Sequence, residues 1–282
     1  MSDSNENLAR EKKILSEVNQ KPLLSRWGTF AKLSGPGWLQ GAITLGGGSL
    51  AGSLYLGVIG GYELLWLQPL MMIFGVLMLS VIGYVTLSTG EKPFVAINKH
   101  INPVLGWGWL VAAMLANLVW AMPQFSLGTA ALQQNFGILN GNGGEYWCAL
   151  FLFCVGSVVV WSYDSGSKGV KIFETILKLM VAIVVLSFFG VVVAMAGDLD
   201  WGAIFSGFIP NFSLLSEPAS KFTSIISESS NQEYWREVIL DSQRDRMVTA
   251  AATAVGINMT FLLPYSMLRK GWGKEHRGLA TF

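Results

Sequence analysis

The sequence predicts an all-α protein, a polytopic bundle of transmembrane helices. Its 282 residues are 52% hydrophobic and only 13% charged, and the mean hydropathy is +0.47. This composition is typical of integral membrane proteins and not of soluble domains. Several apolar stretches are long enough to cross a bilayer as helices. The loops between them alternate in their content of Lys and Arg, as the positive-inside rule requires of successive crossings.

The chain divides into a polar tail, residues 1–30, and a transmembrane domain, residues 31–282. The tail carries no short apolar core followed by small residues, so we predict no cleaved signal peptide. Basic residues in the tail, in alternate loops and in the last residues predict a cytoplasmic N-terminus and a place in the cell (inner) membrane. Six spans are expected, at about residues 36–61, 63–87, 105–132, 146–161, 170–196 and 247–268.

The first span is interrupted by three consecutive glycines, Gly46, Gly47 and Gly48, which Ser49 follows. Because glycine holds a helix poorly, we expect two half-helices, at about residues 36–45 and 50–61. In hydrocarbon, the freed backbone N–H and C=O groups need protein, water or a ligand as partners. The run is therefore a candidate binding site. The alternative is that its glycines only let another helix pack closely.

Two later spans also contain helix-disturbing residues. Pro123 is expected to kink or end the helix of the third span. In the sixth span, Asn258, Thr260 and Pro264 interrupt the apolar run. We therefore expect the sixth helix, like the first, to be irregular near its middle.

Between the fifth and sixth spans lies the longest polar segment, residues 198–246, with eight acidic and four basic side chains. The excess of acidic residues predicts that this segment is an outer loop. Within it, the pattern Ser230-x-x-Glu233 is a capping box. It predicts an amphipathic surface helix at about residues 231–245.

Charged side chains are absent from the first, third and sixth spans. Proton relays and divalent-cation sites in membranes normally depend on such side chains. In the fifth span, Glu174 and Lys178 are spaced i and i+4, which favours an ion pair near the interface over a role in coupling. Cys148 and Cys154 lie in an apolar segment and indicate neither a disulfide framework nor a zinc site. Without a nucleophile–base pair or a phosphate-binding loop, we expect no enzyme activity and no cofactor.

Three stretches of the sequence form a recognisable set: Gly-Pro-Gly-Trp-Leu at residues 35–39 with Gly-Tyr-Glu-Leu-Leu-Trp at 61–66, Leu-Gly-Thr-Ala at 127–130, and residues 249–266. Together they resemble the Nramp family of proton-coupled divalent-metal transporters. The resemblance implies the LeuT-type fold, in which helices 1–5 and 6–10 are inverted repeats and substrate lies between the broken helices 1 and 6. The sequence ends shortly after the sixth span, so the second inverted repeat would be largely absent from this chain.

The departures from the family pattern concern its metal ligands. Where the family has Asp-Pro-Gly-Asn in helix 1, this chain has Gly46-Gly47-Gly48-Ser49, and where it has Met-Pro-His in helix 6, this chain has Thr260-Phe261-Leu262. A second family histidine corresponds to Met267, and the acidic pair of helix 3 to Met122 and Phe125. The resemblance thus implies the family's architecture, and the residues predict no metal ligand in it.

The sequence therefore favours an Nramp-like secondary transporter whose substrate is not a classically coordinated divalent metal. Its partners would be the lipid bilayer and a small solute or ion, and no nucleic acid. Two alternatives stay open: a metal ion transporter as in the family, and a non-transporting membrane sensor or assembly subunit that uses residues 198–246 as its contact surface. The expected substrate-binding residues are Thr44, Gly46, Gly47, Gly48, Ser49, Asn258, Thr260 and Tyr265.

Overall fold

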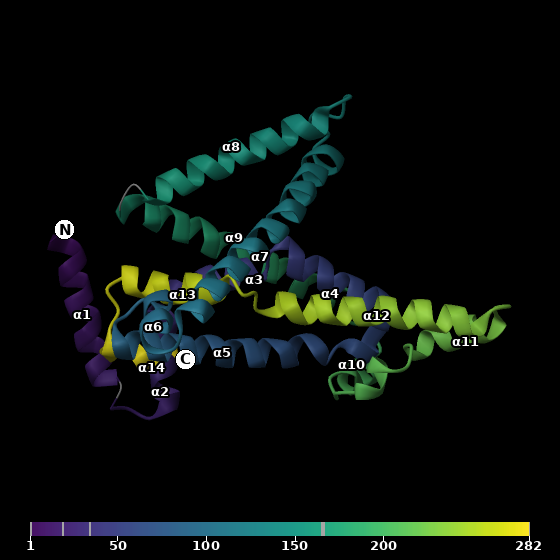
Figure 1. Cartoon of the computed structure of the whole chain (residues 1–282), viewed down its shortest axis with the longest axis horizontal. Helices are drawn as coiled ribbons and strands as arrows, with labels where there is room; N and C mark the ends of the chain where they lie inside the picture. The colour runs from purple at the N-terminus through teal and green to yellow at the C-terminus, as the bar shows by residue number, and fades with distance from the viewer. Residues whose placement is uncertain (1, 19, 34, 165–166, 282) are drawn as a thin grey trace. The chain divides into compact units, whose positions relative to one another are not determined.

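The computed structural model describes residues 2–18, 20–33, 35–164 and 167–281. Within these residues the chain is helical and has no strand, which confirms the all-α prediction. The chain forms two compact units. Unit 1 comprises residues 1–43, 77–180 and 257–282, and unit 2 comprises residues 44–76 and 181–256. Figure 1 shows the helices along the chain.

Five helical segments are long and apolar enough to cross a membrane, judged over the described residues by length and composition. The chain is therefore an integral membrane protein. The first predicted span is not among the five, because it is divided into helices of 10 and 14 residues. The five segments are Leu67–Thr89, Pro103–Asn135, Gly144–Trp161, Thr175–Ala194 and Gln232–Arg269.

Unit 2 is built around the packing of two helices, α4 (Gly47–Gly60) and α12 (Gln232–Ala254). Gly52 of α4 lies against Thr253 and Ala250, and the Tyr55 ring lies 5.0 Å from the guanidinium of Arg246. Because a later residue of α4 meets an earlier residue of α12, the two helices are antiparallel. The remaining elements of unit 2 are η1 (Gly61–Leu64), the first part of α5 (Leu67–Thr89), α10 (Trp201–Gly207), η3 (Phe212–Leu215), η4 (Ser220–Phe222), α11 (Thr223–Glu228) and the last part of α9 (Ser167–Ala194).

The buried side chain of Gln243 fixes residues 214–219 to α12. Its Oε1 accepts the Ala219 N–H at 2.9 Å, and its Nε2 donates to the carbonyls of Leu214 and Glu217. Leu214 and Ala219 in turn belong to an apolar core with residues of α4, η1, α5 and α12, namely Leu56, Leu64, Trp66, Leu67, Met247 and Ala250. Residues 214–219 thus contribute to the core of unit 2.

Helix α12 differs from the helix predicted for residues 231–245. It continues without interruption to Ala254 and so joins the predicted surface helix to the first part of the predicted sixth span. No helix-breaking residue lies between its ends, and its contact with α4 covers the later turns. The predicted capping box was wrong, because the N-cap is Asn231 and makes no side-chain capping bond.

Unit 1 contains the helices of the polar tail and the longest apolar helices. The elements are α1 (Ser2–Val18), α2 (Leu23–Leu33), α3 (Gly35–Thr44, its last residue in unit 2), the last part of α5, α6 (Pro93–His100), α7 (Pro103–Ala130), η2 (Ala131–Asn135), α8 (Gly144–Asp164), the first part of α9, α13 (Met259–Arg269), η5 (Lys274–His276) and α14 (Arg277–Ala280). Pro123 lies inside α7 and does not end it. The side chain of Glu174 lies outside the described residues, so its ion pair with Lys178 stays a prediction.

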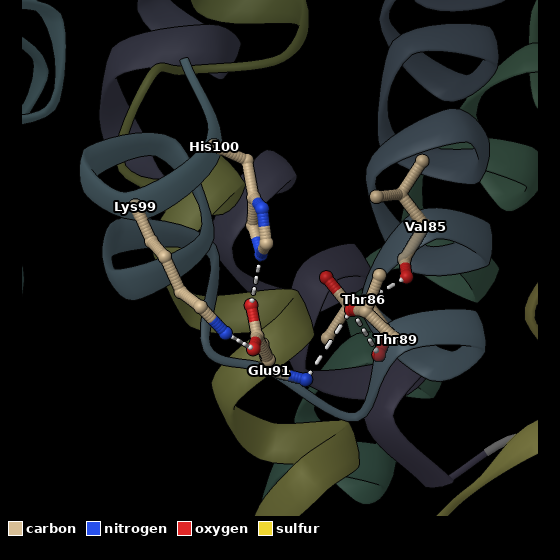
Figure 2. Close-up of polar contacts among 6 residues, drawn as sticks. All are labelled: Val85, Thr86, Thr89, Glu91, Lys99 and His100. Atoms are coloured by element: carbon tan, nitrogen blue, oxygen red, sulfur yellow. Dashed lines mark hydrogen bonds and ion pairs between the residues drawn. The ribbon is translucent and has the colours of Figure 1, made fainter. Parts of the chain in front are cut away.

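Hydrogen bonds fix the corner between α5 and α6, as Figure 2 shows. The Thr89 hydroxyl donates to the Val85 carbonyl and accepts the Glu91 N–H at 3.2 Å. The Glu91 carboxylate accepts from Lys99 Nζ at 2.7 Å and lies 3.0 Å from His100 Nε2. Hydrogen bonds from Lys99 and His100 hold the pKa of Glu91 below its ordinary value. A single carboxylate thus connects the end of α5 to the last turn of α6.

We predict that Gln243→Ala destabilises unit 2 strongly. The substitution leaves one buried N–H and two carbonyls without their partner, which should cost at least about 2 kcal/mol of unfolding free energy. The unfolding midpoint of the purified protein in detergent measures this loss. Gln232→Ala is the matched control, because Gln232 is exposed at the start of the same helix and should change the midpoint little. Equal midpoints for the two variants would contradict the prediction.

Candidate functional site

The first predicted span is broken where the glycine run begins. Helix α3 ends at Thr44 and α4 begins at Gly47, with Leu45 and Gly46 between them. Gly46 is the N-cap, in an extended conformation, and its carbonyl accepts the Leu50 N–H at 3.1 Å. The N–H groups of Gly47, Gly48 and Ser49 occupy the first turn, where a helix offers no acceptor. This break therefore presents three amide donors at the positive end of the α4 dipole.

The sixth predicted span is broken as well, near its middle. Helix α12 ends at Ala254 and α13 begins at Met259, so the irregular residues are 255–258 and include Asn258. Thr260 and Pro264, which interrupt the apolar run of the sequence, lie inside α13. Pro264 is tolerated there because its missing N–H removes only one bond of the helix, the one to the Thr260 carbonyl.

Within unit 2, the two breaks bring opposite helix ends to one side. Because α4 and α12 are antiparallel, the first turn of α4 and the last turn of α12 lie at the same end of the pair. The first turn of α4 offers N–H donors, and the last turn of α12 offers carbonyl acceptors. The arrangement can bind a group that carries both a hydrogen-bond acceptor and a donor or cation.

Helix α5 supports this end of unit 2 at close range. A Cβ atom at Gly75 would lie only 2.1 Å from Val255 Cγ2, so the α5 backbone touches the first residue of the interruption. Two turns earlier in α5, Gln68 Nε2 donates to the Ala250 carbonyl at 3.2 Å. Sequence reasoning missed both residues. The signals that could have identified them are a glycine and an amide inside an otherwise apolar span.

In unit 1, Thr260 joins the first turn of α13 to α7. Its hydroxyl donates to the Ile257 carbonyl and accepts the indole N–H of Trp109 at 3.1 Å. The Trp109 ring also stacks on Phe261, with centroids 3.6 Å apart and planes 10° apart. Thr260 is buried, and both hydrogen-bonding roles of its hydroxyl are used by these contacts. Sequence reasoning also missed Trp109, an aromatic side chain that positions the predicted site residue Thr260.

Two other predicted site residues lie on the same short helix or at its start. Asn258 is the N-cap of α13, and its carbonyl accepts the N–H groups of Phe261 and Leu262. Its side chain makes no capping bond. The Tyr265 ring lies 6.1 Å from that of Phe261 and 5.9 Å from Lys92 Nζ. Lys92 belongs to the corner between α5 and α6, so this corner contacts α13.

The predicted site residues fall into two groups. Thr44 and the run from Gly46 to Ser49 belong to unit 2, and Asn258, Thr260 and Tyr265 belong to unit 1. Each group is local to its own unit, and their union in one binding site stays a prediction. Among the described residues, no three His, Cys, Asp or Glu side chains gather as a metal ion would require.

Membrane-spanning helices and two helix interruptions define the class as that of polytopic helical membrane proteins. The chain belongs to the Nramp family: the family model described as natural resistance-associated macrophage protein-like matches residues 37–228, more than half of the sequence. The resemblance inferred from the sequence motifs is thereby confirmed.

The chain is also similar, at low identity, to two curated relatives. The chain is 25% identical over 174 residues to "Metal transporter Nramp2" of Oryza sativa subsp. japonica, covering 57% of this chain and 30% of the relative. It is 26% identical over 187 residues to "Manganese transporter pdt1" of Schizosaccharomyces pombe, covering 66% of this chain and 35% of the relative. The matches thus span about a third of the length of these relatives.

We predict that Gly75→Ala and Gly52→Ala have opposite outcomes, although both add one methyl group to a packed helix. At Gly75 the methyl would overlap Val255, whereas at Gly52 the nearest atom is Thr253 Oγ1 at 3.5 Å, an ordinary contact. Gly75→Ala should therefore cost about 1–3 kcal/mol of unfolding free energy. Gly52→Ala should be neutral or stabilising by up to about 1 kcal/mol, because alanine favours the helix. Unfolding midpoints in detergent test both, and a larger loss for Gly52→Ala would contradict the packing described above.

Proposed function

We propose that this protein is a secondary transporter for a neutral, zwitterionic or weakly charged solute or ion. The observation that carries the proposal is the pair of opposite helix ends in unit 2, the N–H groups at the start of α4 beside the carbonyls at the end of α12. Membership of a family whose curated relatives are named as transporters supports transport as the class of activity.

The chemistry of this lining favours a dipolar substrate. Amide groups at a helix start stabilise a carboxylate or another acceptor, and carbonyls at a helix end stabilise an ammonium group or a cation. The proposed substrate-binding residues are Thr44, Gly46, Gly47, Gly48 and Ser49 of unit 2, and Asn258, Thr260 and Tyr265 of unit 1. Of these, Thr260 would act mainly by holding α13, since its hydroxyl already has a donor and an acceptor.

A divalent metal fits the lining less well. Dehydrating such an ion is costly, and proteins normally compensate the cost with carboxylates. The segments 33–62 and 247–268 contain no Asp or Glu. We accordingly propose the family's arrangement, with broken helices 1 and 6, a cytoplasmic N-terminus and a site near mid-membrane, without its metal coordination.

Metal transport is the second candidate, because the two relatives are named as a metal transporter and a manganese transporter. In that case a partly hydrated ion would bind through backbone carbonyls. Two measurements separate the candidates: uptake of a panel of amino acids, small neutral solutes and monovalent ions into proteoliposomes, and calorimetry with manganese, magnesium and cadmium. Solute uptake without a heat of metal binding is expected. Heat from millimolar manganese with no solute uptake would favour the metal candidate. The absence of both solute uptake and a heat of metal binding would refute transport by this protein.

We further predict that Gly46→Asp creates binding of divalent metal. Asp is a favourable N-cap, and the extended conformation of Gly46 accommodates it, so the helix should be retained. The new carboxylate would stand at the first turn of α4, at the same end of the helix pair as the last turn of α12. Calorimetry with manganese should then give a heat that the parent lacks.

Gly57→Asp is the matched control, because it adds the same charge to an exposed position nearer the other end of α4. Equal binding by both variants would mean that the charge and not the site attracts the ion. An absence of binding in Gly46→Asp, with the fold intact, would count against a family-like site at the glycine run.

A further inference from the structure

The segment that follows α13 folds back through a Schellman motif. Gly271 has φ +76°, the left-handed conformation that glycine adopts without strain. Its N–H donates to the Leu268 carbonyl at 3.0 Å, and the next N–H, of Trp272, donates to the Met267 carbonyl at 3.1 Å. The motif turns the chain sharply at the end of α13, so that the indole of Trp272 is buried and η5 follows at once.

At the end of η5, His276 is completely buried. Its ring stacks on Trp272, with centroids 5.2 Å apart and planes 10° apart. Nδ1 accepts the Gly273 N–H at 3.2 Å, which places the proton of the neutral ring on Nε2. In the part of the chain that the structure describes, Nε2 is buried and has no hydrogen-bond partner. The site is therefore built for a neutral imidazole.

Helix α1 lies against this segment with one face. The residues of that face are spaced i, i+3, i+4 and i+7, as one side of a helix requires: Leu8, Glu11, Lys12 and Leu15. Leu8 packs on Gly271, where a Cβ atom would lie 2.9 Å from Leu8 Cδ2, and Lys12 Nζ lies 3.9 Å from the Glu275 carboxylate. Leu15 is completely buried.

We propose that the contact between α1 and the segment from Gly271 to His276 is a pH-sensitive latch, closed while His276 is neutral and opened when His276 is protonated. Protonation would put a charge into a buried stack, force the Gly273 N–H away from Nδ1 and oppose the ammonium group of Lys12. The latch restrains the chain directly after α13, the helix that carries Asn258, Thr260 and Tyr265.

The ionisable groups around the contact determine in which direction a change of pH shifts the equilibrium between the closed and the open latch. Burial lowers the pKa of His276 most, the neighbouring Glu275 raises it in part, Lys12 lowers it further, and a backbone hydrogen bond with Gly273 raises it in part. The pKa of His276 is lower in the closed latch than in the open one. The free energy that favours closing is therefore fully present at a pH above the ordinary pKa of histidine. It weakens as the pH falls below about 6.5.

Two carboxyl groups add effects at lower pH. Burial raises the pKa of Glu11, with Lys270 opposing, so acid would strengthen closing through Glu11. The pKa of Glu275 is lowered, first by a backbone hydrogen bond and then by the charges of Lys12, His276 and Arg277, so acid would weaken closing through Glu275 below about pH 4.5. A Glu11→Gln background removes the opposing effect, and measurement between pH 7.5 and 5.5 avoids the second one.

The latch is tested by thiol accessibility on α1. Leu15→Cys reports opening because the side chain is buried, and Ser16→Cys is the matched exposed site on the same helix. Both are made in a Cys148→Ala, Cys154→Ala, Glu11→Gln background, and the ratio of their maleimide labelling rates removes the intrinsic pH dependence of the reaction. From pH 7.5 to 5.5 the ratio should rise about threefold or more.

The sequence offers a matched histidine control, because it contains only two histidines, His100 and His276. His276→Gln should keep the ratio constant, and His100→Gln should keep the full rise. A ratio that stays flat in the parent, a rise that persists in His276→Gln, or a rise that disappears in His100→Gln would each overturn the proposal. If Leu15→Cys itself loosens α1, hydrogen exchange of residues 8–18, corrected for intrinsic rates, gives the same comparison in chains with the native leucine.

Discussion

Hydrocarbon offers a peptide group no hydrogen-bond partner, and this constraint governs the two interrupted helices of the chain. A span that stops at Thr44 and restarts at Gly47 exposes N–H and C=O groups that a continuous helix would have paired. The structure meets part of this cost locally. Gly46 caps α4 through its own carbonyl, and Thr260 closes the first turn of α13 through its hydroxyl. What remains unpaired by the helices themselves is a small set of backbone donors and acceptors, which is the usual basis of substrate recognition at broken helices.

Small and amide side chains hold the interrupted ends in place within unit 2. Gly52 of α4 lies against Ala250 and Thr253 of α12, and Gly75 lets α5 approach Val255, so that three helices meet where α12 stops. Gln68 then supplies a hydrogen bond to the Ala250 carbonyl, near the end of α12. Close backbone approach and a few hydrogen bonds are the principal sources of helix association in a membrane, where apolar burial alone gives little.

The sequence was sufficient for those features that depend on local composition. Apolar length indicated the spanning helices, and the glycine run indicated the break after Thr44 to within about two residues. It was insufficient where a distant residue decides the outcome. The hydrogen bond between Trp109 and Thr260 joins positions 151 residues apart, and the bonds of Gln243 reach across 24 to 29 residues to the outer segment. The same lack of tertiary information explains why the Ser230 motif was misread.

Charge and backbone polarity are divided between different parts of the described structure. Several of its ion pairs and charged hydrogen bonds lie at helix ends: Glu63 with Ser220 and Lys221 with the Val58 carbonyl beside the end of α4, Glu91 with Lys99 and His100 after α5, and Lys12 with Glu275 after α13. Another, between Asp241 and Arg244, lies within α12. After the second interruption, by contrast, Thr260 and Phe261 contact the indole of Trp109. In a medium of low dielectric constant, a fixed charge at an interruption would dominate the choice of ligand and favour its counter-ion. The positive end of one helix and the negative end of another impose a weaker and more general requirement on the ligand: it must itself carry a dipole that complements theirs. A transporter that had kept the family's broken helices while losing charge at the break would therefore change its class of substrate without changing its architecture.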